Sequence, residues 1–396
     1  MGWLTATQAL RLLAVRPQTL YANVSRRRIR ARSDPKDPRR SLYHEADVLR
    51  LARSRSGARK AERVASGAIE WGDPILPSAI STVANGRLWY RGEDAVLLAE
   101  TRTLEEVARL LWEAPPESQG SMQPAGIERA ALARARERAR VATATVASPL
   151  SRMFVALGCR AGEDPPSYGR APAVLRTEAV GVLATLADSI LPRRDGAALH
   201  ERLAMAWRRR PAADLLRRAL VLLADHELNA STFAARVTVS TGASLASGVL
   251  AGLSTLSGPL HGRASAGVFE MLRAGTRAGM SATVREWLQQ GRPLSGFGHP
   301  LYPDGDVRAK ALLGEFAVPA AFREPLAVVE ELAGERPNID FAVAALTQAF
   351  RLPAHAPLTL FALARSVGWL AHGLEQASAG HLIRPRARYV GVPVGP

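Results

Sequence analysis

The chain has 396 residues, 47% of them hydrophobic, and its 52 Lys and Arg against 36 Asp and Glu give a formal net charge of +16 at pH 7. This length and composition allow a large buried core and about two or three domains, so we predict a soluble, globular protein. The single cysteine, Cys159, excludes an intrachain disulfide, and Cys/His spacings of the zinc-site kind are absent, which predicts a reducing, cytoplasmic compartment and no metal site.

Neither a secretory signal nor a membrane span is expected. Gln8 and Arg11 interrupt the apolar residues near the N-terminus before the core of a signal peptide can form. The longest uncharged run, residues 237–260, is long enough to cross a bilayer, but it is rich in Ser, Thr and Gly and ends in a Gly-Pro turn. We therefore expect one tightly packed, buried helix there.

The positive charge is concentrated near the N-terminus. Residues 1–60 contain fifteen Lys or Arg and four Asp or Glu, a net charge of +11, which leaves +5 for the other 336 residues. A preference for Arg over Lys does not by itself concentrate net charge in one segment. A concentrated basic segment attracts phosphate backbones, so a polyanion is a candidate partner.

Residues 3–55 show the pattern of a small domain with a hairpin. Thr5 can cap a first helix, and Pro17 suits the first position of a second one. The expected elements are, in order, helices over residues 6–13 and 17–25, extended pieces over residues 29–32 and 40–43, and a helix over residues 45–52. This order resembles the winged helix-turn-helix of excisionase and MerR-type DNA-binding domains.

That resemblance implies a DNA-binding domain over residues 1–55, with the second helix in the major groove and the hairpin against phosphate or the minor groove. The residues that would contact duplex DNA are Arg16, Gln18, Thr19, Asn23, Arg26, Arg39 and Arg40. The alternative is a protein-docking module whose arginines are merely solvated. Salt-sensitive binding to duplex DNA separates the two.

The rest of the chain has a different pattern. Residues 56–74 show no strong periodicity and are expected to form a linker. An Asn85-Gly86 turn between two extended pieces then predicts a β-hairpin, and Thr103 with Glu106 forms a capping-box pattern at the start of a helix. The remainder is rich in Ala, Leu and Arg with Pro and Gly breaks, so we predict a mainly α-helical fold.

Three histidines in the second half have glycine, proline or polar neighbours that allow a close approach of a ligand. They are His226 within residues 224–232, His261 within residues 257–262 and His299 within residues 296–302. Singly, each is explained as a turn residue, and Asp340 as the cap of a helix. Together with Arg308, Arg365 and Arg384, these residues indicate acid/base chemistry on a small polyanion.

Six segments in this order closely resemble motifs of the citrate synthase family, and the resemblance extends from about residue 75 to the C-terminus. They are Ala-Asp-His-Glu-Leu-Asn at residues 224–229, Ser-Gly-Pro-Leu-His-Gly at 257–262, Gly-Phe-Gly-His-Pro-Leu-Tyr at 296–302, Pro-Asn-Ile-Asp-Phe at 337–341, Arg-Ser-Val-Gly-Trp-Leu-Ala-His-Gly at 365–373 and Arg-Pro-Arg-Ala-Arg-Tyr at 384–389. The resemblance implies a large helical domain of residues 75–263 and 359–396 and a small helical domain of residues 264–358. Closure of the two would assemble the site and exclude water.

In that family, acetyl-CoA is condensed with oxaloacetate and the product thioester is hydrolysed, without a bound cofactor. The resemblance implies that Asp340 is the base that removes the methyl proton, that His261 hydrogen-bonds the thioester oxygen, and that His299 polarises the ketone. The residues that would bind the oxaloacetate carboxylates are His226, Arg308, Arg365 and Arg384. The last corresponds to an arginine supplied by the partner subunit, so a homodimer or a higher homo-oligomer is expected.

Two departures from the family pattern leave the identity of the thioester substrate undecided. Where many members have His-Gly-Gly-Ala-Asn, this chain has Arg263 and Ser265, and where many bacterial members have His-Arg-Val-Tyr it has Pro300 and Leu301. One arginine near the expected CoA site is thereby lost and another is added nearby. The alternatives are a 2-methylcitrate synthase that uses propionyl-CoA and a DNA-binding regulator whose synthase body senses metabolites.

Overall fold

The computed structural model describes residues 2–13, 20, 23–24, 29–35, 37–48, 76–114, 126–194, 196–387 and 389–392. The chain forms two compact units, one of residues 1–77 with 386–396 and the other of residues 78–385, called the body below. Each unit has a hydrophobic core of its own. Among the described residues, no helix is both long and apolar enough to cross a membrane.

The N-terminal unit contains a three-stranded antiparallel sheet with a helix packed on it. Its elements are β1 (Trp3–Thr5), α1 (Ala6–Leu13), β2 (Ala31–Asp34) and β3 (Asp37–His44), with β3 between the other two strands. The predicted cap of the first helix is confirmed, because the Gln8 amide donates to Thr5 Oγ1 at 3.4 Å and the Thr5 amide donates to Gln8 Oε1 at 2.9 Å. The core is formed by Ala9, Leu13, Leu20, Ile29, Tyr43 and Val48.

The hairpin expected in this unit is present, with its first strand displaced by two residues and its second strand longer than predicted. Arg32 lies opposite Leu42 and Ser33 lies opposite Ser41. The predicted helix over residues 17–25 lies outside the described residues, apart from Leu20, Asn23 and Val24. Most of the predicted DNA contacts also fall there: Arg16, Gln18, Thr19 and Arg26 are outside the described residues, and Arg39 and Arg40 are described only as backbone of β3. The winged helix-turn-helix therefore stays a prediction.

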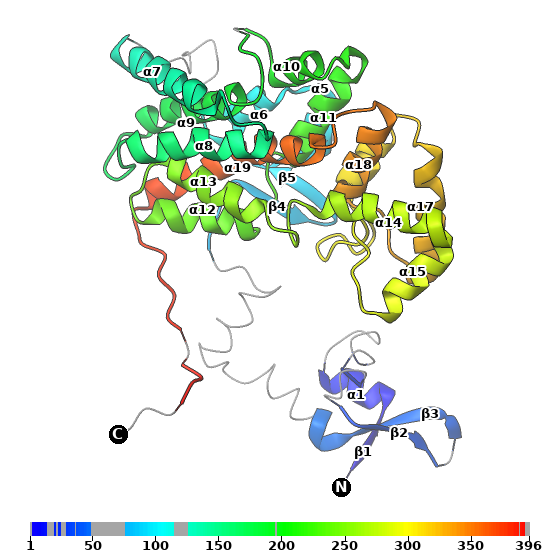
Figure 1. The fold of residues 1–396 in the computed structure, drawn as a ribbon. Coiled ribbons are helices and arrows are strands. Elements are labelled where there is room, and N and C mark those ends of the chain that lie inside the picture. The colour runs from blue at the N-terminus through cyan, green and yellow to red at the C-terminus, as the bar shows by residue number, and fades with distance from the viewer. Residues whose placement is uncertain are drawn as a thin grey trace, which may run out of the picture. The chain divides into compact units, whose positions relative to one another are not determined.

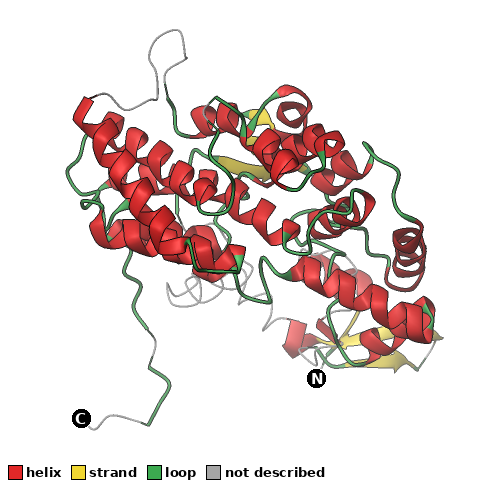
Figure 2. Cartoon of the chain, turned by 45° about the horizontal axis from the view of Figure 1, so that its top comes forward, coloured by secondary structure: helices red, strands yellow, loops and turns green. Residues whose placement is uncertain are grey.

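The body is mainly helical, as its composition predicts, with a small antiparallel sheet among the helices (Figure 2). The strands are β4 (Ser81–Ala84), β5 (Arg87–Tyr90) and β6 (Glu93–Asp94). The helices are α5 (Ala95–Thr101), α6 (Leu104–Leu111), α7 (Gly126–Thr143), α8 (Pro149–Glu163), α9 (Pro172–Asp188), α10 (Leu199–Ala206), the 3-10 helix η2 (Arg210–Ala212), α11 (Ala213–Leu223), α12 (Ala230–Ser240), α13 (Leu245–Leu256), α14 (Ala264–Ala278), α15 (Met280–Gln289), α16 (Val307–Leu313), α17 (Ala320–Ala333), α18 (Ile339–Ala349) and α19 (Ala356–Ala379).

Short-range sequence signals in the body are confirmed. The β4–β5 turn has positive φ at Asn85 and Gly86, 53° and 72°, as a tight hairpin turn requires. At the start of α6, the Thr103 amide donates to Glu106 Oε2 at 2.7 Å and the Glu106 amide donates to Thr103 Oγ1 at 3.2 Å, which completes the capping box.

The uncharged run of residues 237–260 forms parts of two helices, so the prediction of one helix is wrong. Helix α12 ends at Ser240, and Ser244 caps α13 by accepting from the Ser247 amide at 3.2 Å. Gly242, with φ of 86°, lies between them in a conformation that ends a helix and that glycine adopts readily. The break brings α12 and α13 together as antiparallel neighbours, which are drawn side by side in Figure 1.

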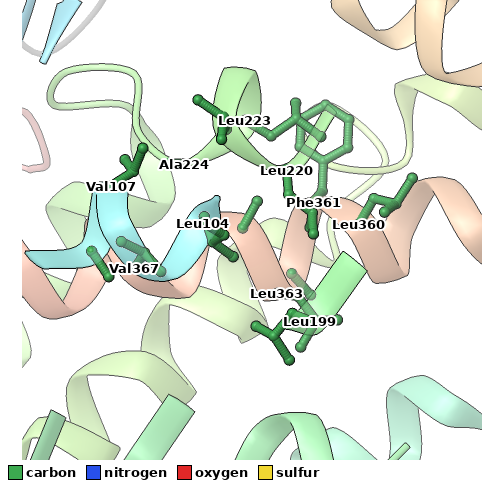
Figure 3. Packing of buried hydrophobic residues seen from close by; sticks show 14 of the residues in the cluster. Leu104, Val107, Leu199, Leu220, Leu223, Ala224, Leu360, Phe361, Leu363 and Val367 are labelled. Carbon is green, nitrogen blue, oxygen red and sulfur yellow. The ribbon is translucent and has the colours of Figure 1, made fainter. Parts of the chain in front are cut away.

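Helix α19 runs through the larger core of the body, and every residue from Leu360 to Leu374 is buried. Figure 3 shows its side chains Leu360, Phe361, Leu363 and Val367 among those of α6, α10 and α11. A helix that is apolar on all sides belongs inside a protein. The charged Arg365 in this stretch is therefore held in the interior by packing all around it.

A smaller core lies among α14, α15, α17 and α18, the yellow and orange helices grouped on one side of the body in Figure 1. Helix α18 joins the two cores, because Val343 packs in the larger one and Phe341 in the smaller one. Ala309 and Leu312 of α16 pack in the larger core. The boundaries of the two predicted domains stay predictions, but the helix that carries Asp340 clearly contacts both cores.

Candidate active site

Two loops from distant parts of the sequence meet at His226 and His299. His226 lies between α11 and α12 and is 7% exposed, and His299 lies in the loop before α16. Their ring centroids are 5.0 Å apart with the planes at 83°. Tyr302 fixes this arrangement, because its hydroxyl is 2.9 Å from Nε2 of His226 and its ring lies 5.1 Å from that of His299.

The loop around His226 is held by the cap of α12. Oδ1 of Asn229 accepts from the amides of Ser231 and Thr232 at 3.1 and 3.2 Å, and its Nδ2 donates to the His226 carbonyl at 3.2 Å. A side-chain cap of this kind satisfies amides that the first helical turn leaves without partners. The same residue therefore starts the helix and fixes the backbone that carries the imidazole.

The third histidine, His261, reaches this loop through Ser231. Nε2 of His261 lies 2.8 Å from the Ser231 hydroxyl, which also accepts from Nε1 of Trp369 at 3.2 Å. The hydroxyl has a single proton, and both His261 Nε2 and Asn229 Oδ1, at 2.7 Å, lie within its reach. When the proton points to His261, the ring proton of that imidazole is at Nδ1, the atom not bound by Ser231.

The three imidazoles are neutral at pH 7. Burial, with Arg365 nearby, lowers the pKa of His261 to about 4, and burial with Arg308 lowers the pKa of His299 to about 4. Burial together with Arg308 and the other imidazoles holds the pKa of His226 well below its ordinary value. Because Nδ1 of His299 accepts from the Leu301 amide at 3.2 Å, its ring proton is at Nε2.

Asp340 lies in the first turn of α18, but it does not cap that helix. The cap is Asn338, whose Oδ1 accepts from the amides of Asp340 and Phe341 at 3.0 and 3.4 Å. The carboxylate of Asp340 instead accepts from the Ser265 hydroxyl at 2.9 Å. Burial raises the pKa of Asp340 to about 6, against the effect of this hydrogen bond. A carboxylate with such a pKa suits a general base at neutral pH.

The two buried arginines have different surroundings. Arg308 forms a two-pronged pair with Asp306, Nε to Oδ1 at 3.0 Å and Nη2 to Oδ2 at 2.8 Å. Although burial alone would lower it, Asp306 holds the pKa of Arg308 above its ordinary value. Arg365 is 3% exposed and donates from Nε to the Leu223 carbonyl at 3.0 Å.

Within the described part of the chain, no carboxylate lies within ion-pair distance of Arg365, and burial lowers its pKa. A buried guanidinium with donors left over is costly unless an anion binds it. Arg384, by contrast, is exposed after α19, and no described contact joins it to the other predicted site residues. In the described residues, no group of His, Cys, Asp and Glu is arranged to hold a metal ion.

The comparisons with known proteins agree with this arrangement. The family model of the citrate synthase C-terminal domain matches residues 67–386, most of the chain. The chain belongs to the citrate synthase family. Members of this family are enzymes that transfer an acyl group in a condensation, need no cofactor and use acetyl-CoA as a substrate.

Citrate synthase 2 of Bacillus subtilis is 31% identical over 345 residues, which cover 79% of this chain and 93% of that protein. Citrate synthase of Haloferax volcanii is 44% identical over 185 residues, 44% of this chain, and this match spans about half (49%) of the relative's length. The crystal structure of citrate synthase from Thermotoga maritima covers 82% of this chain and 96% of its own, with 30% identity and a TM-score of 0.64.

A ternary complex of the citrate synthase from Thermoplasma acidophilum with carboxymethyl coenzyme A and oxaloacetate has the same fold. Its TM-score is 0.65 at 23% identity, and it covers 84% of this chain and 97% of its own. The mainly helical citrate synthase fold predicted for the body is thereby confirmed. The roles of individual residues remain predictions. The structure brings six of the seven into one group with shared contacts or electrostatic coupling, in which His226, Arg308 and Arg365 are buried.

Several residues of this candidate site were not predicted. Tyr302, Ser231 and Asp306 bind His226, His261 and Arg308 respectively. Each lies inside or close to a recognised motif, which is the one signal that could have found it. Ser265 was noted only as a departure from the family pattern, and its bond to Asp340 could not be read from the sequence.

Proposed function

We propose that this protein is a citrate synthase that condenses acetyl-CoA with oxaloacetate and releases citrate and CoA. The observation that supports it best is the buried Arg365, which has guanidinium donors to spare beside neutral imidazoles and a carboxyl of raised pKa. A dicarboxylate supplies the anion that this site needs. His226 and Arg308 would bind its other end, with Asp306 keeping the Arg308 guanidinium in place.

The condensation begins at the methyl group of the thioester. Asp340 takes a proton from that carbon, and the thioester oxygen gains negative charge. His261 stabilises this charge through Nδ1–H when the Ser231 hydroxyl donates to its Nε2. The new carbanion attacks the ketone carbon of oxaloacetate and forms the carbon–carbon bond. The ketone oxygen becomes an alkoxide that accepts a hydrogen bond from Nε2–H of His299 and is protonated, while Asp340 gives up the proton it took, so the proton count balances. Water then hydrolyses the thioester and the CoA thiol leaves.

Neutral imidazoles suit these roles. Because the pKa values of His261 and His299 are about 4, each ring has one N–H to donate at pH 7 and is uncharged. An uncharged ring does not lower the pKa of Asp340 as a positive charge would. A base with a strongly lowered pKa would be a poor acceptor for a weakly acidic C–H bond. The burial that lowers the histidine pKa values thus also raises that of Asp340.

The choice of thioester is tested by release of free thiol from the purified protein with oxaloacetate. We expect turnover with acetyl-CoA at a higher kcat/KM than with propionyl-CoA. A preference for propionyl-CoA would make the protein a 2-methylcitrate synthase, since one methyl group changes discrimination by about 1–3 kcal/mol. Oxaloacetate binding without turnover of either thioester would instead favour a metabolite-sensing regulator.

Two further parts of the proposal concern assembly and closure. Arg384, exposed in this chain, would reach the site of a partner subunit in a cytoplasmic homodimer. Mixing Arg384→Ala with Asp340→Asn protein should restore turnover by forming hybrid dimers with one intact site.

The small domain, residues 264–358, would close on the large one when oxaloacetate binds. A smaller radius of gyration in solution scattering with oxaloacetate is expected from closure.

We also propose that the N-terminal unit binds duplex DNA. Residues 1–60 have a net charge of +11, and β2 and β3 form a hairpin of the kind that a wing provides. On this hairpin, Arg32 stacks on Trp3 at 4.2 Å, while Arg30 is paired with Asp47 at 2.7 Å and so has a structural partner. Binding to duplex DNA that weakens steeply with added salt is expected. If the unit does not bind DNA at low salt, the alternative, a protein-docking module, is favoured.

A further inference from the structure

A cavity of about 930 Å³ lies on the β4–β5 hairpin, and none of the predicted active-site residues lines it. Its size is within the range of small-molecule sites. The lining comes from β4, from the end of β5 and from the C-terminal end of α6, where Arg109, Leu110 and Glu113 contribute.

The cavity is on the outer face of the hairpin. Thr82 and Trp89 are directly opposite each other in the β4–β5 register, so their side chains share one face. The other face carries Leu88 and Tyr90, which are fully buried in the larger core. The half-buried ring of Trp89 therefore offers a flat apolar surface to the cavity, as in sites that stack planar rings.

One cation of the lining, Arg91, keeps a donor for an anion. Among the described residues that line the cavity, the charged side chains are Arg91, Arg109 and Glu113. Arg91 donates from Nε to the Leu111 carbonyl at 3.0 Å and from Nη1 to Glu113 at 2.7 Å. In the part of the chain that the structure describes, its Nη2 group makes no recorded hydrogen bond, so it can donate to a carboxylate or phosphate.

Strand β4 connects this cavity to the loop of His226. The Ser81 hydroxyl donates to Oδ2 of Asp225, and the Thr82 hydroxyl donates to Oε1 of Glu227 at 3.1 Å. These two acidic residues are the chain neighbours of His226. Glu227 has φ of 50°, a left-handed conformation that surrounding contacts must hold in a residue with a side chain. Thr82, a lining residue of the cavity, is one of those contacts.

We propose that this cavity binds a small anion carrying a planar ring, and that the ligand changes the affinity of the His226 site for its dicarboxylate through Thr82 and Glu227. A ligand that stacks on Trp89 and contacts Thr82 shifts the hydroxyl that binds the Glu227 carboxylate, while the Glu227 amide is held by the Ser81 hydroxyl at 2.9 Å. The effect is reciprocal, because a change in one affinity requires an equal change in the other. Only the identity of the dicarboxylate, oxaloacetate, rests on the proposed function.

The site is tested by calorimetric titration of the full chain with two probes, adenosine monophosphate and 1-naphthoate, which present a phosphate or a carboxylate beside a planar ring. We expect at least one probe to bind once per chain, and Trp89→Ala to weaken it at least tenfold. Trp207→Phe, at a half-buried tryptophan of the body that does not line the cavity, is the control and should leave binding unchanged. If neither probe binds, or if Trp89→Ala binds as tightly as wild type, the proposal is wrong.

The coupling is tested with oxaloacetate titrations in the presence and absence of the bound probe. Wild type should show a change in oxaloacetate affinity of about fivefold or more. Thr82→Val keeps the shape of the side chain but removes its hydroxyl, so the probe should still bind while the change falls below about twofold. Thr82→Ser keeps the hydroxyl and should retain the change, which controls for damage to the fold.

The outcomes separate this inference from the proposed function. If oxaloacetate does not bind the protein at all, the proposed function fails, and the probe titrations at Trp89 still report on the cavity. If oxaloacetate binds and the bound probe leaves its affinity unchanged, the coupling is overturned. An equal change in wild type and in Thr82→Val would also contradict it, because Thr82 is the contact that the inference names.

Discussion

The Ser265 hydroxyl donates a hydrogen bond to Oδ1 of Asp340 at 2.9 Å and thereby links the first turns of α14 and α18. Ser265 is 2% exposed, so water does not compete readily for this bond. Two opposing effects therefore set the pKa of Asp340, since burial raises it to about 6 and the bond from Ser265 favours the ionised form.

Ser265→Ala should move the acid limb of the kcat/KM profile to higher pH. Losing one hydrogen bond to a charged group, worth on the order of 1–2 kcal/mol, raises the pKa of Asp340 by roughly one unit. Thiol release at pH 6 should fall about fivefold or more, while the rate at pH 9 stays near that of wild type. Ser281→Ala, an exposed serine on α15, is the control. An unchanged acid limb would show that Ser265 does not act on the base.

Asp340→Asn should stabilise the protein at neutral pH. The folded-state pKa of about 6 exceeds the unfolded value of 3.8, so the folded chain binds more protons, and stability falls as the pH rises from about 4 to about 6. Above pH 6 the ionised Asp340 lowers the free energy of unfolding by its full amount, roughly 3 kcal/mol for a pKa raised by about two. Denaturant unfolding should thus show a gain for the variant at pH 7 that nearly disappears at pH 4. The same gain at both values would mean that ionisation is not its cause.

Arg365→Met should weaken oxaloacetate binding while raising stability. A buried guanidinium without an ion-pair partner is costly, and an apolar side chain of similar length removes that cost. Calorimetry should show about a hundredfold or larger loss of oxaloacetate affinity, since charge-assisted bonds to a carboxylate are lost. Arg273→Met, at an exposed arginine of α14, should change neither property. Undiminished oxaloacetate affinity would remove Arg365 from the proposed site.

Tyr302→Phe should lower kcat/KM for oxaloacetate by about tenfold. The variant leaves Nε2 of the buried His226 without its partner at 2.9 Å, a loss of about 1–2 kcal/mol. Burial raises the pKa of Tyr302, so its hydroxyl keeps its proton and the loss should be the same from pH 6 to pH 9. Steady-state kinetics with Tyr168→Phe, at an exposed tyrosine, provide the comparison. A loss confined to one end of the pH range would point to a titrating Tyr302 instead.

The parts of the fold that could be predicted from the sequence depend on neighbouring residues. The capping box of Thr103 and Glu106 and the Asn85-Gly86 turn use contacts within four residues, so residue types alone specify them. Gly242 was overlooked as a helix end because the run around it has no charge to mark a boundary. The motifs placed His226 and His299 in one site only through the family resemblance.

The remaining features depend on packing between distant segments. Ser265 and Asp340 are 75 residues apart in the sequence, and Ser231 and His261 are 30 apart, so no local pattern specifies their pairing. That no carboxylate among the described residues pairs with Arg365 depends on the helices that surround α19, which only the three-dimensional structure shows. For the same reason the cavity beside Trp89 has no signature in the sequence.

The most direct test of the proposed function is the rate of thiol release from acetyl-CoA at pH 8 by wild type and by Asp340→Asn, with and without oxaloacetate. We expect release by wild type only when oxaloacetate is present, and a fall of about a thousandfold or more in the variant, because Asn cannot accept the methyl proton. Oxaloacetate should bind both proteins with similar affinity. Equal rates in the two proteins, or release that does not require oxaloacetate, would contradict condensation by Asp340 in this site.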